Sequence, residues 1–125
     1  MRLLVDTHVL LWIMANDPAL SPAAREIIGQ ADTVYASAAS IWEVSIKSAL
    51  GKLKINHERF VKALPASGFT PLPITWAHAD AVQRLPNHHR DPFDRMLLAQ
   101  AISEPLRLLT ADQMLAQYSE LVIAV

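Results

Sequence analysis

The chain has 125 residues and a net charge of −1, and 52% of its residues are hydrophobic. We expect residues 1–125 to form one compact domain, because this length suits a single core. The absence of cysteine excludes disulfides and thiolate metal sites. No apolar run approaches the roughly 20 residues of a membrane span, and the N-terminal segment is charged too early for a signal peptide. We therefore expect a cytoplasmic protein without a membrane partner.

Basic side chains are concentrated in the middle of the sequence. Residues 1–46 hold two basic and five acidic residues, whereas residues 47–95 hold eight basic and four acidic ones. A basic region around an acidic centre is compatible with a protein that grips a polyanion. The simpler interpretation of the cluster at 47–62 is a solvated helix face.

Strand and helix patterns alternate along the chain. We expect strands at 2–6, 33–36, 69–74, 106–110 and 121–125, and helices at 8–15, 22–29, 38–50, 57–64, 76–85, 91–103 and 112–117. Pro71 and Pro73 cannot donate ladder hydrogen bonds, so the third strand should be an edge strand or irregular. This alternation predicts an α/β fold with a mostly parallel central sheet and helices on both of its faces.

Acidic residues lie where such a sheet would gather them. Asp6 and Asp112 follow apolar strands, Asp94 lies in the first turn of an apolar helix, and Glu43 lies inside another helix. In open parallel sheets, the binding crevice lies beyond the carboxyl ends of the strands. We therefore expect these four carboxylates to share one cleft.

Carboxylates in one cleft repel each other, so their negative charge must be neutralised. Two unit charges about 4 Å apart interact by roughly 4 kcal/mol at an effective dielectric constant of about 20. Protons or a cation must neutralise such a cluster, and a hard divalent cation is the natural candidate because it prefers oxygen ligands.

Each acidic residue also has a purely structural interpretation. Asp6, Asp91 and Asp112 could cap the helices that follow them, and Asp94 suits the third helical position behind the first-turn Pro92. Glu43 could form a surface pair with the lysine four residues later, Lys47.

Several other residues have two interpretations. His88 and His89 are adjacent on a predicted loop, where we expect loop or substrate contacts rather than paired metal ligands. Trp12, Trp42 and Trp76 are predicted to be core residues, with base stacking as the second interpretation.

Four ordered segments carry a specific resemblance. They are Val5-Asp6-Thr7-His8 with the apolar residues that follow, Ser40–Lys47 with Leu50–Leu53, His89–Ala101, and Leu109-Thr110-Ala111-Asp112. Together they resemble the motifs of the PIN-domain family, and within it the VapC-type toxins of prokaryotic type II toxin–antitoxin systems. The match spans nearly the whole chain, although the segment between Gly51 and Thr75 matches nothing diagnostic.

This resemblance implies a single PIN-like domain with Mg²⁺- or Mn²⁺-dependent endoribonuclease activity. Asp6, Glu43, Asp94 and Asp112 match the catalytic, metal-binding quartet, and Asp91 is an additional acid that could join it. The bound ion would orient water for in-line attack. We expect four basic residues to position RNA phosphates: Lys47, Lys52, Arg90 and Arg95. The resemblance also implies a cognate antitoxin and a homodimer.

Two other functions compete with this one. Aspartyl-phosphate phosphotransferases also place an aspartate after the first strand, but they need a second acid two residues later, where this chain has His8. The other alternative is a catalytically inactive PIN-like module that binds RNA or a partner protein, and the intact quartet argues against it.

Overall fold

The computed structural model describes residues 1–87 and 90–125, so the predictions for His88 and His89 lie outside the described residues. Five parallel strands form one sheet in the order β3-β2-β1-β4-β5. The strands are β1 (Arg2–Val5), β2 (Thr33–Ser37), β3 (Phe69–Leu72), β4 (Arg107–Thr110) and β5 (Val122–Ala124). The predicted parallel α/β sheet is confirmed, and each strand lies within one or two residues of its expected position.

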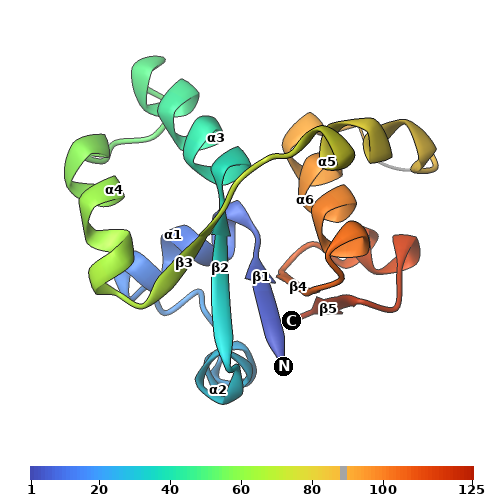
Figure 1. The fold of residues 1–125 in the computed structure, drawn as a ribbon. Coiled ribbons are helices and arrows are strands. Elements are labelled where there is room, and N and C mark those ends of the chain that lie inside the picture. Colours follow the sequence, from blue (N-terminus) through green and yellow to red (C-terminus); the bar gives the residue numbers. More distant parts are fainter. Residues whose placement is uncertain (88–89) are drawn as a thin grey trace.

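Helices cover both faces of this sheet (Figure 1). They are α1 (Thr7–Ala15), α2 (Pro22–Gln30), α3 (Ala38–Ala49), α4 (His57–Ala66), α5 (Trp76–Ala81), α6 (Pro92–Ser103) and the 3₁₀ helices η1 (Val82–Arg84) and η2 (Gln113–Tyr118). The last part of the predicted 76–85 helix and the whole of the predicted 112–117 helix are thus 3₁₀ turns. None of the helices in the described residues is long and apolar enough to cross a membrane.

Alternation along β1 divides the core into two parts. Leu3 and Val5 point into a cluster with α1, α2, α3 and α4, whereas Leu4 points into a cluster with α6 and η2. All three side chains are fully buried, as expected of a central strand that is covered on both faces. Because β1 lies in the middle of the sheet, the residue that follows it lies at the centre of the sheet edge.

The edge position of β3 agrees with its prolines. Pro71 pairs in register with Ala36 of β2 on one side of β3, and no strand of residues 1–87 or 90–125 lies on its other side. Proline is tolerated there because a missing N–H disturbs no second ladder. Pro73 lies beyond the strand.

The tryptophan prediction is wrong for two of its three residues. Trp42 is 59% exposed and Trp76 is 95% exposed, whereas Trp12 packs against the first core cluster. Trp76 is the first residue of α5. Trp42 meets the ring of Phe93 edge-on, with ring centroids 5.1 Å apart. Apolar side chains therefore remain on the surface near α3 and α5.

Candidate active site

Asp6 occupies the carboxyl end of the central strand and is buried at 4% exposure. Its Oδ1 accepts a hydrogen bond from the Val9 N–H at 2.9 Å and so caps α1, as predicted. Its Oδ2 accepts a hydrogen bond from the Thr110 hydroxyl at 2.5 Å. Both carboxylate oxygens are thus fixed by groups from two neighbouring elements.

Burial raises the pKa of Asp6, because removing a carboxylate from water disfavours its charged form. The hydrogen bonds from Thr110 and Val9 and the nearby His8 lower this pKa in part, and the charge of Glu43 raises it further. Asp6 and Glu43 are therefore close enough to repel each other. An additional positive charge near Asp6 would offset both the free-energy cost of burying its charged carboxylate and its repulsion by Glu43.

Glu43 lies inside α3 and is also buried, at 4% exposure. Its Oε2 accepts a hydrogen bond from Lys47 Nζ at 2.6 Å. The predicted i,i+4 pair exists, but it is not a surface pair because the Glu43 side chain is only 5% exposed. Lys47 therefore offsets the charge of a buried carboxylate, although its own side chain is 42% exposed.

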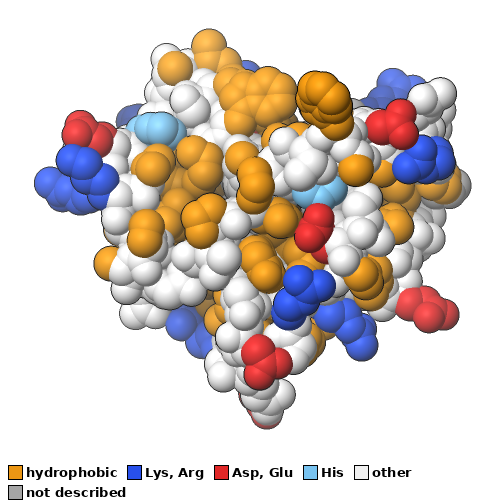
Figure 2. Space-filling view, viewed as in Figure 1, with side chains coloured by type: hydrophobic (Ala, Val, Ile, Leu, Met, Phe, Trp, Pro, Cys, Tyr) orange, Lys and Arg blue, Asp and Glu red, His pale blue; other side chains and the backbone are white. Residues whose placement is uncertain are grey.

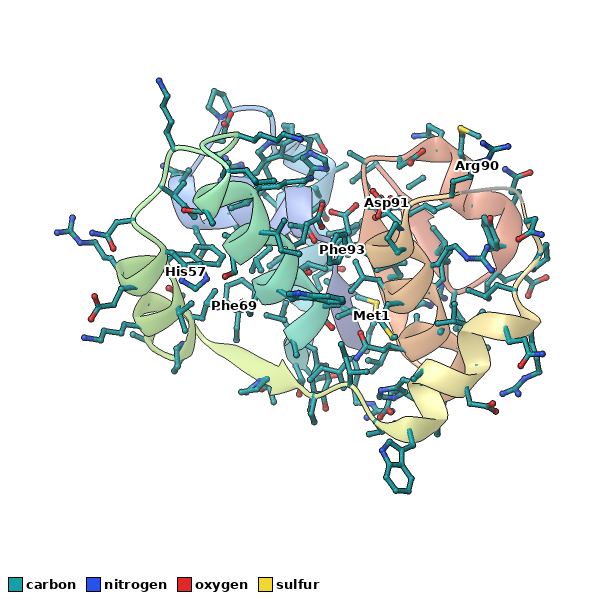
Figure 3. The ribbon with its side chains drawn as sticks, turned by 90° about the horizontal axis from the view of Figure 1, so that it is seen from above. Met1, His57, Phe69, Arg90, Asp91 and Phe93 are labelled. Carbon is teal, nitrogen blue, oxygen red and sulfur yellow. The ribbon has the colours of Figure 1, made fainter. Side chains whose placement is uncertain are left out.

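The helix α6 brings Asp91 and Asp94 near the ammonium group of Lys47. The pKa of Lys47 is raised mainly by its hydrogen bond to Glu43 and also by the charges of Asp91 and Asp94. Asp91 caps α6 by accepting from the N–H groups of Phe93 and Asp94 at 2.8 and 3.2 Å, which confirms its predicted structural role. Figure 3, viewed from above, shows Asp91 and Phe93 at the start of α6 on the side that faces α3.

Asp112 is tied to the site through Thr110. The Asp112 N–H donates to Thr110 Oγ1 at 3.0 Å, while the Asp112 carboxylate caps η2 through Met114 N–H at 2.9 Å. One threonine hydroxyl therefore links the carboxylate of Asp6 to the backbone of Asp112. Only the polar residue type at position 110 could have indicated this double contact from the sequence.

Two buried hydrogen bonds that could not be predicted from the sequence hold α3 in place. Thr7 Oγ1 donates to Ser40 Oγ at 3.0 Å and joins α1 to α3. Ser37, the N-cap of α3, donates to Gln100 Oε1 of α6 at 2.6 Å. Both Ser37 and Gln100 are fully buried. These contacts set the relative positions of the helices that carry Glu43 and Asp94.

A second buried contact extends from Gln100 to α5, where the Nε2 atom of Gln100 lies 3.5 Å from Nδ1 of His78. His78 accepts from the Thr75 N–H through Nδ1 at 3.1 Å, so its Nε2 carries the proton that it shares with Glu104 at 2.6 Å. Thr75 and His78 together form a capping box. Gln100 Nε2 also donates to the Pro73 carbonyl at 3.3 Å.

The predicted phosphate-binding residues have different surroundings. Arg95 donates to the backbone carbonyls of Pro86, Val82 and Leu85 at 2.8, 3.2 and 3.3 Å. Lys52 and Arg90 are exposed, and Lys47 is paired with Glu43. The structure thus shows Arg95 anchoring the segment after η1, and phosphate contacts by all four residues remain predictions.

Within residues 1–87 and 90–125, no group of three or more acidic or histidine side chains is arranged to hold a metal ion. The oxygen-rich donor set nevertheless suits Mg²⁺ or Mn²⁺, and the raised pKa of Asp6 indicates a lack of compensating positive charge. An ion bound by Glu43 would compete with the Lys47 ammonium for the charge of this carboxylate.

The profile of the family described as PIN domain matches residues 3–121. The chain belongs to the PIN-domain family. It is also 31% identical over 124 residues to Ribonuclease VapC22 of Mycobacterium tuberculosis, and the match covers 92% of this chain and 90% of that protein. The predicted resemblance to VapC-type PIN proteins is thereby confirmed.

Solved structures share the PIN fold along almost their whole length. VapBC2 from Rickettsia felis, bound to a DNA fragment from its promoter, has a TM-score of 0.73 at 15% identity and covers 100% of this chain and 99% of that one. VapBC-1 from nontypeable Haemophilus influenzae has a TM-score of 0.70 at 19% identity and covers 99% and 98%. A toxin–antitoxin complex from Klebsiella pneumoniae has a TM-score of 0.69 at 19% identity and covers 97% and 95%. At these identities, the similarity shows the fold alone.

The PIN fold explains why distant acids of this chain approach each other. Asp6 follows β1, Asp112 follows β4 beside it, and α3 and α6 carry Glu43 and Asp94 to the same edge of the sheet. Shared partners connect these residues in pairs: Thr110 contacts Asp6 and Asp112, and Lys47 lies in the field of Glu43 and Asp94.

Proposed function

We propose that this protein is an endoribonuclease and the toxin of a type II toxin–antitoxin system. It would hydrolyse RNA phosphodiester bonds with the help of Mg²⁺ or Mn²⁺. The observation that carries this proposal is the buried Asp6 at the end of β1, fixed through both oxygens and placed within the field of Glu43. The ribonuclease name of the relative that is 31% identical supports it.

Asp6, Glu43, Asp94 and Asp112 would hold the ion, with Asp91 as an additional candidate. When bound, the ion would lower the pKa of water, orient it and offset charge on the phosphate. The protein contributes rigidity, because Thr110 and the first turn of α1 fix the Asp6 carboxylate before substrate arrives. Lys47, Lys52, Arg90 and Arg95 would hold the RNA backbone.

The RNA would be cut by hydrolysis without a covalent enzyme intermediate. The described part of the cleft contains carboxylates, hydroxyl groups that are engaged in buried hydrogen bonds, and ammonium groups. Thr7 and Thr110 both donate their hydroxyl protons to buried partners. These hydroxyl groups serve to orient Ser40 and Asp6, and water remains the nucleophile in the proposed reaction.

The decisive experiment is cleavage of a structured RNA pool by the purified protein with Mg²⁺, Mn²⁺ or chelator. We expect discrete metal-dependent cuts that Asp6→Asn and Asp94→Asn abolish. Asp80→Asn is a matched control, because Asp80 is exposed on α5 and pairs with Arg84 at 3.0 Å. Cleavage that survives Asp6→Asn would exclude the proposed site. RNA binding without cleavage by the wild-type protein would support the alternative of an inactive PIN-like binding module.

A cognate antitoxin and a second copy of this chain are the proposed protein partners. Toxin–antitoxin complexes are among the solved structures with this fold. Figure 2 shows apolar side chains gathered over α3, α4 and β3, where a mainly apolar pocket of about 680 Å³ lies. Such surface is typical of protein–protein contacts. Light scattering should report a dimer that Val61→Ser, at an exposed residue lining this pocket, weakens without unfolding the protein.

A further inference from the structure

A cavity of about 280 Å³ opens between α1, α3 and the segment that follows α3, beside the proposed acidic cleft of Asp6, Glu43, Asp94 and Asp112. Its volume lies just below the range for sites that bind a whole small molecule, which is about 300–1,000 Å³, so it suits one part of a larger ligand. The walls combine charged, polar and apolar groups. They are formed by Thr7, His8, Leu11, Glu43, Val44, Lys47, Lys52 and Leu53.

The turn after α3, at residues 51–53, forms one wall of this cavity and is held close to α3. Gly51 has a φ of +73° and turns the chain back at the end of α3. The N–H groups of Lys52 and Leu53 then both donate to the Lys47 carbonyl, at 2.9 and 3.2 Å. This turn places the Lys52 and Leu53 side chains at the cavity in a fixed backbone position.

The charge of the cavity favours an anion in spite of Glu43. The Lys47 ammonium is hydrogen-bonded to Glu43 at 2.6 Å and offsets its charge. Lys52 is exposed, and its ammonium group makes no hydrogen bond within the described part of the chain. The exposed His8 adds a ring nitrogen donor on the opposite wall. A phosphate group could therefore be held between Lys52 and His8.

The remaining walls suit a planar apolar group. Leu11, Val44 and Leu53 supply aliphatic surface, and the imidazole of His8 lies against the indole of Trp12 with ring centroids 6.1 Å apart. Unstacked bases of single-stranded RNA are commonly bound by stacking on aromatic rings, including histidine. One cavity thus offers both an anion contact and a base contact.

We infer that this cavity is a nucleotide subsite, which binds the nucleotide adjacent to the cleaved phosphodiester through Lys52, His8 and the leucine side chains. The inference rests on the proposed endoribonuclease function and deepens it, since it places the determinant of base preference on α1 and on the turn after α3. The cavity shares Glu43 and Lys47 with the acidic cleft, so a nucleotide bound here would lie next to the proposed catalytic carboxylates.

Nuclear magnetic resonance titrations test this directly, without relying on cleavage. Each of the four nucleoside 5′-monophosphates would be added to the ¹⁵N-labelled full chain in the presence of chelator. We expect the largest chemical-shift changes at the amides of Thr7, His8, Val44 and Leu53. Lys52→Met should weaken nucleotide binding at least fivefold, whereas Lys62→Met should not change it, because Lys62 lies on α4 and pairs with Glu58. Both lysines are exposed, so both variants should fold.

Three results would overturn the subsite. They are shift changes confined to other regions, an equal loss of affinity in Lys62→Met, or inorganic phosphate binding as tightly as the nucleotides, which would exclude the base contact. Cleavage by the wild-type protein without nucleotide shifts at the cavity would leave the nuclease proposal intact and remove the subsite. Nucleotide binding at the cavity without any RNA cleavage would show that the cavity binds nucleotides but would remove its assignment as a subsite next to a cleaved phosphodiester.

Discussion

The hydroxyl of Thr110 lies 2.5 Å from Oδ2 of Asp6, although the two residues are 104 positions apart in the chain. The contact exists because β1 and β4 are neighbours, with Val5 paired to Leu109. Thr110 is fully buried and also accepts a hydrogen bond from the Asp112 N–H. One side chain therefore fixes the carboxylate and the backbone of two proposed metal ligands.

Replacing Thr110 by valine should destabilise the protein by about 1–3 kcal/mol. The change keeps the shape of the side chain but leaves Asp6 Oδ2 and the Asp112 N–H without their partner in a buried place. Urea denaturation at neutral pH measures the effect. Thr70→Val is the matched control, since Thr70 is exposed on the edge strand β3, and an equal loss in both variants would contradict the proposed role.

Replacing Asp6 by asparagine should stabilise the metal-free protein at neutral pH. The raised pKa of Asp6 means that its carboxyl binds a proton more tightly in the folded chain than in the unfolded chain, where the ordinary value is 3.8. The favourable contribution of protonated Asp6 is therefore fully present below pH 3.8 and is lost as the pH rises through the folded-state pKa. The gain from Asp6→Asn should accordingly shrink on acidification, as measured by urea midpoints between pH 4 and 8.

Asp32 provides a control of opposite sign for this pH series. Its fully exposed carboxylate pairs with the amino group of Met1, and this partner lowers the pKa of Asp32. Its contribution to stability is present above pH 3.8 and is lost as the pH falls through the lowered folded-state pKa. Asp32→Asn should thus give no gain at neutral pH. The same stabilisation in both variants would show that a general reduction in negative charge, not the burial of Asp6, is responsible.

Replacing Lys47 by methionine should increase the response of the protein to Mn²⁺. The change removes the cation that is bound to the buried Glu43, so the metal-free protein should lose about 1–3 kcal/mol of stability. The freed Glu43 could then contact the ion directly, and the rise in unfolding temperature on adding Mn²⁺ should exceed that of the wild type. Lys62→Met removes a pair of the same spacing that is exposed on both sides and should leave both quantities unchanged. An unaltered Mn²⁺ response in Lys47→Met would separate Lys47 from the metal site.

Replacing Gln100 by methionine should weaken Mn²⁺ binding at a distance from the ligands. Gln100 joins the N-cap of α3 to α6 through Ser37, and both side chains are fully buried. Loss of this contact should cost about 1–3 kcal/mol and loosen the spacing between Glu43 and Asp94. Calorimetric titration with Mn²⁺ measures the second effect. Gln113→Met at an exposed position of η2 serves as the control, and a loss of stability with unchanged Mn²⁺ affinity would limit Gln100 to a structural role.

The capping residues in the sequence predicted where most of the helices begin. Asp6, Ser21, Asn56, Thr75 and Asp91 all cap the helices that follow them. Each of these contacts spans at most three residues, so local residue types are sufficient to indicate it. The buried strands could also be predicted from the sequence, because a strand that is covered on both faces appears there as a continuous apolar run.

Contacts between distant segments could not be predicted in the same way. The partnership of Ser37 with Gln100 spans 63 residues and depends on how α6 packs against β2 and α3. Exposure of Trp42 and Trp76 was missed because residue type favours burial, whereas the helix surfaces on which they lie have no covering element within the described chain. The burial of Glu43 beneath Lys47 likewise depends on the position of α1 and α6 relative to α3.

The strand order β3-β2-β1-β4-β5 joins distant parts of the sequence at the proposed site. The central strand β1 leads to Asp6, and its neighbour β4 leads to Thr110 and Asp112. A fragment that ends before β4 contains Asp6 but lacks the hydroxyl that fixes it. If the proposed activity is correct, two fragments divided before β4 would each be inactive, and activity would return only when they associate.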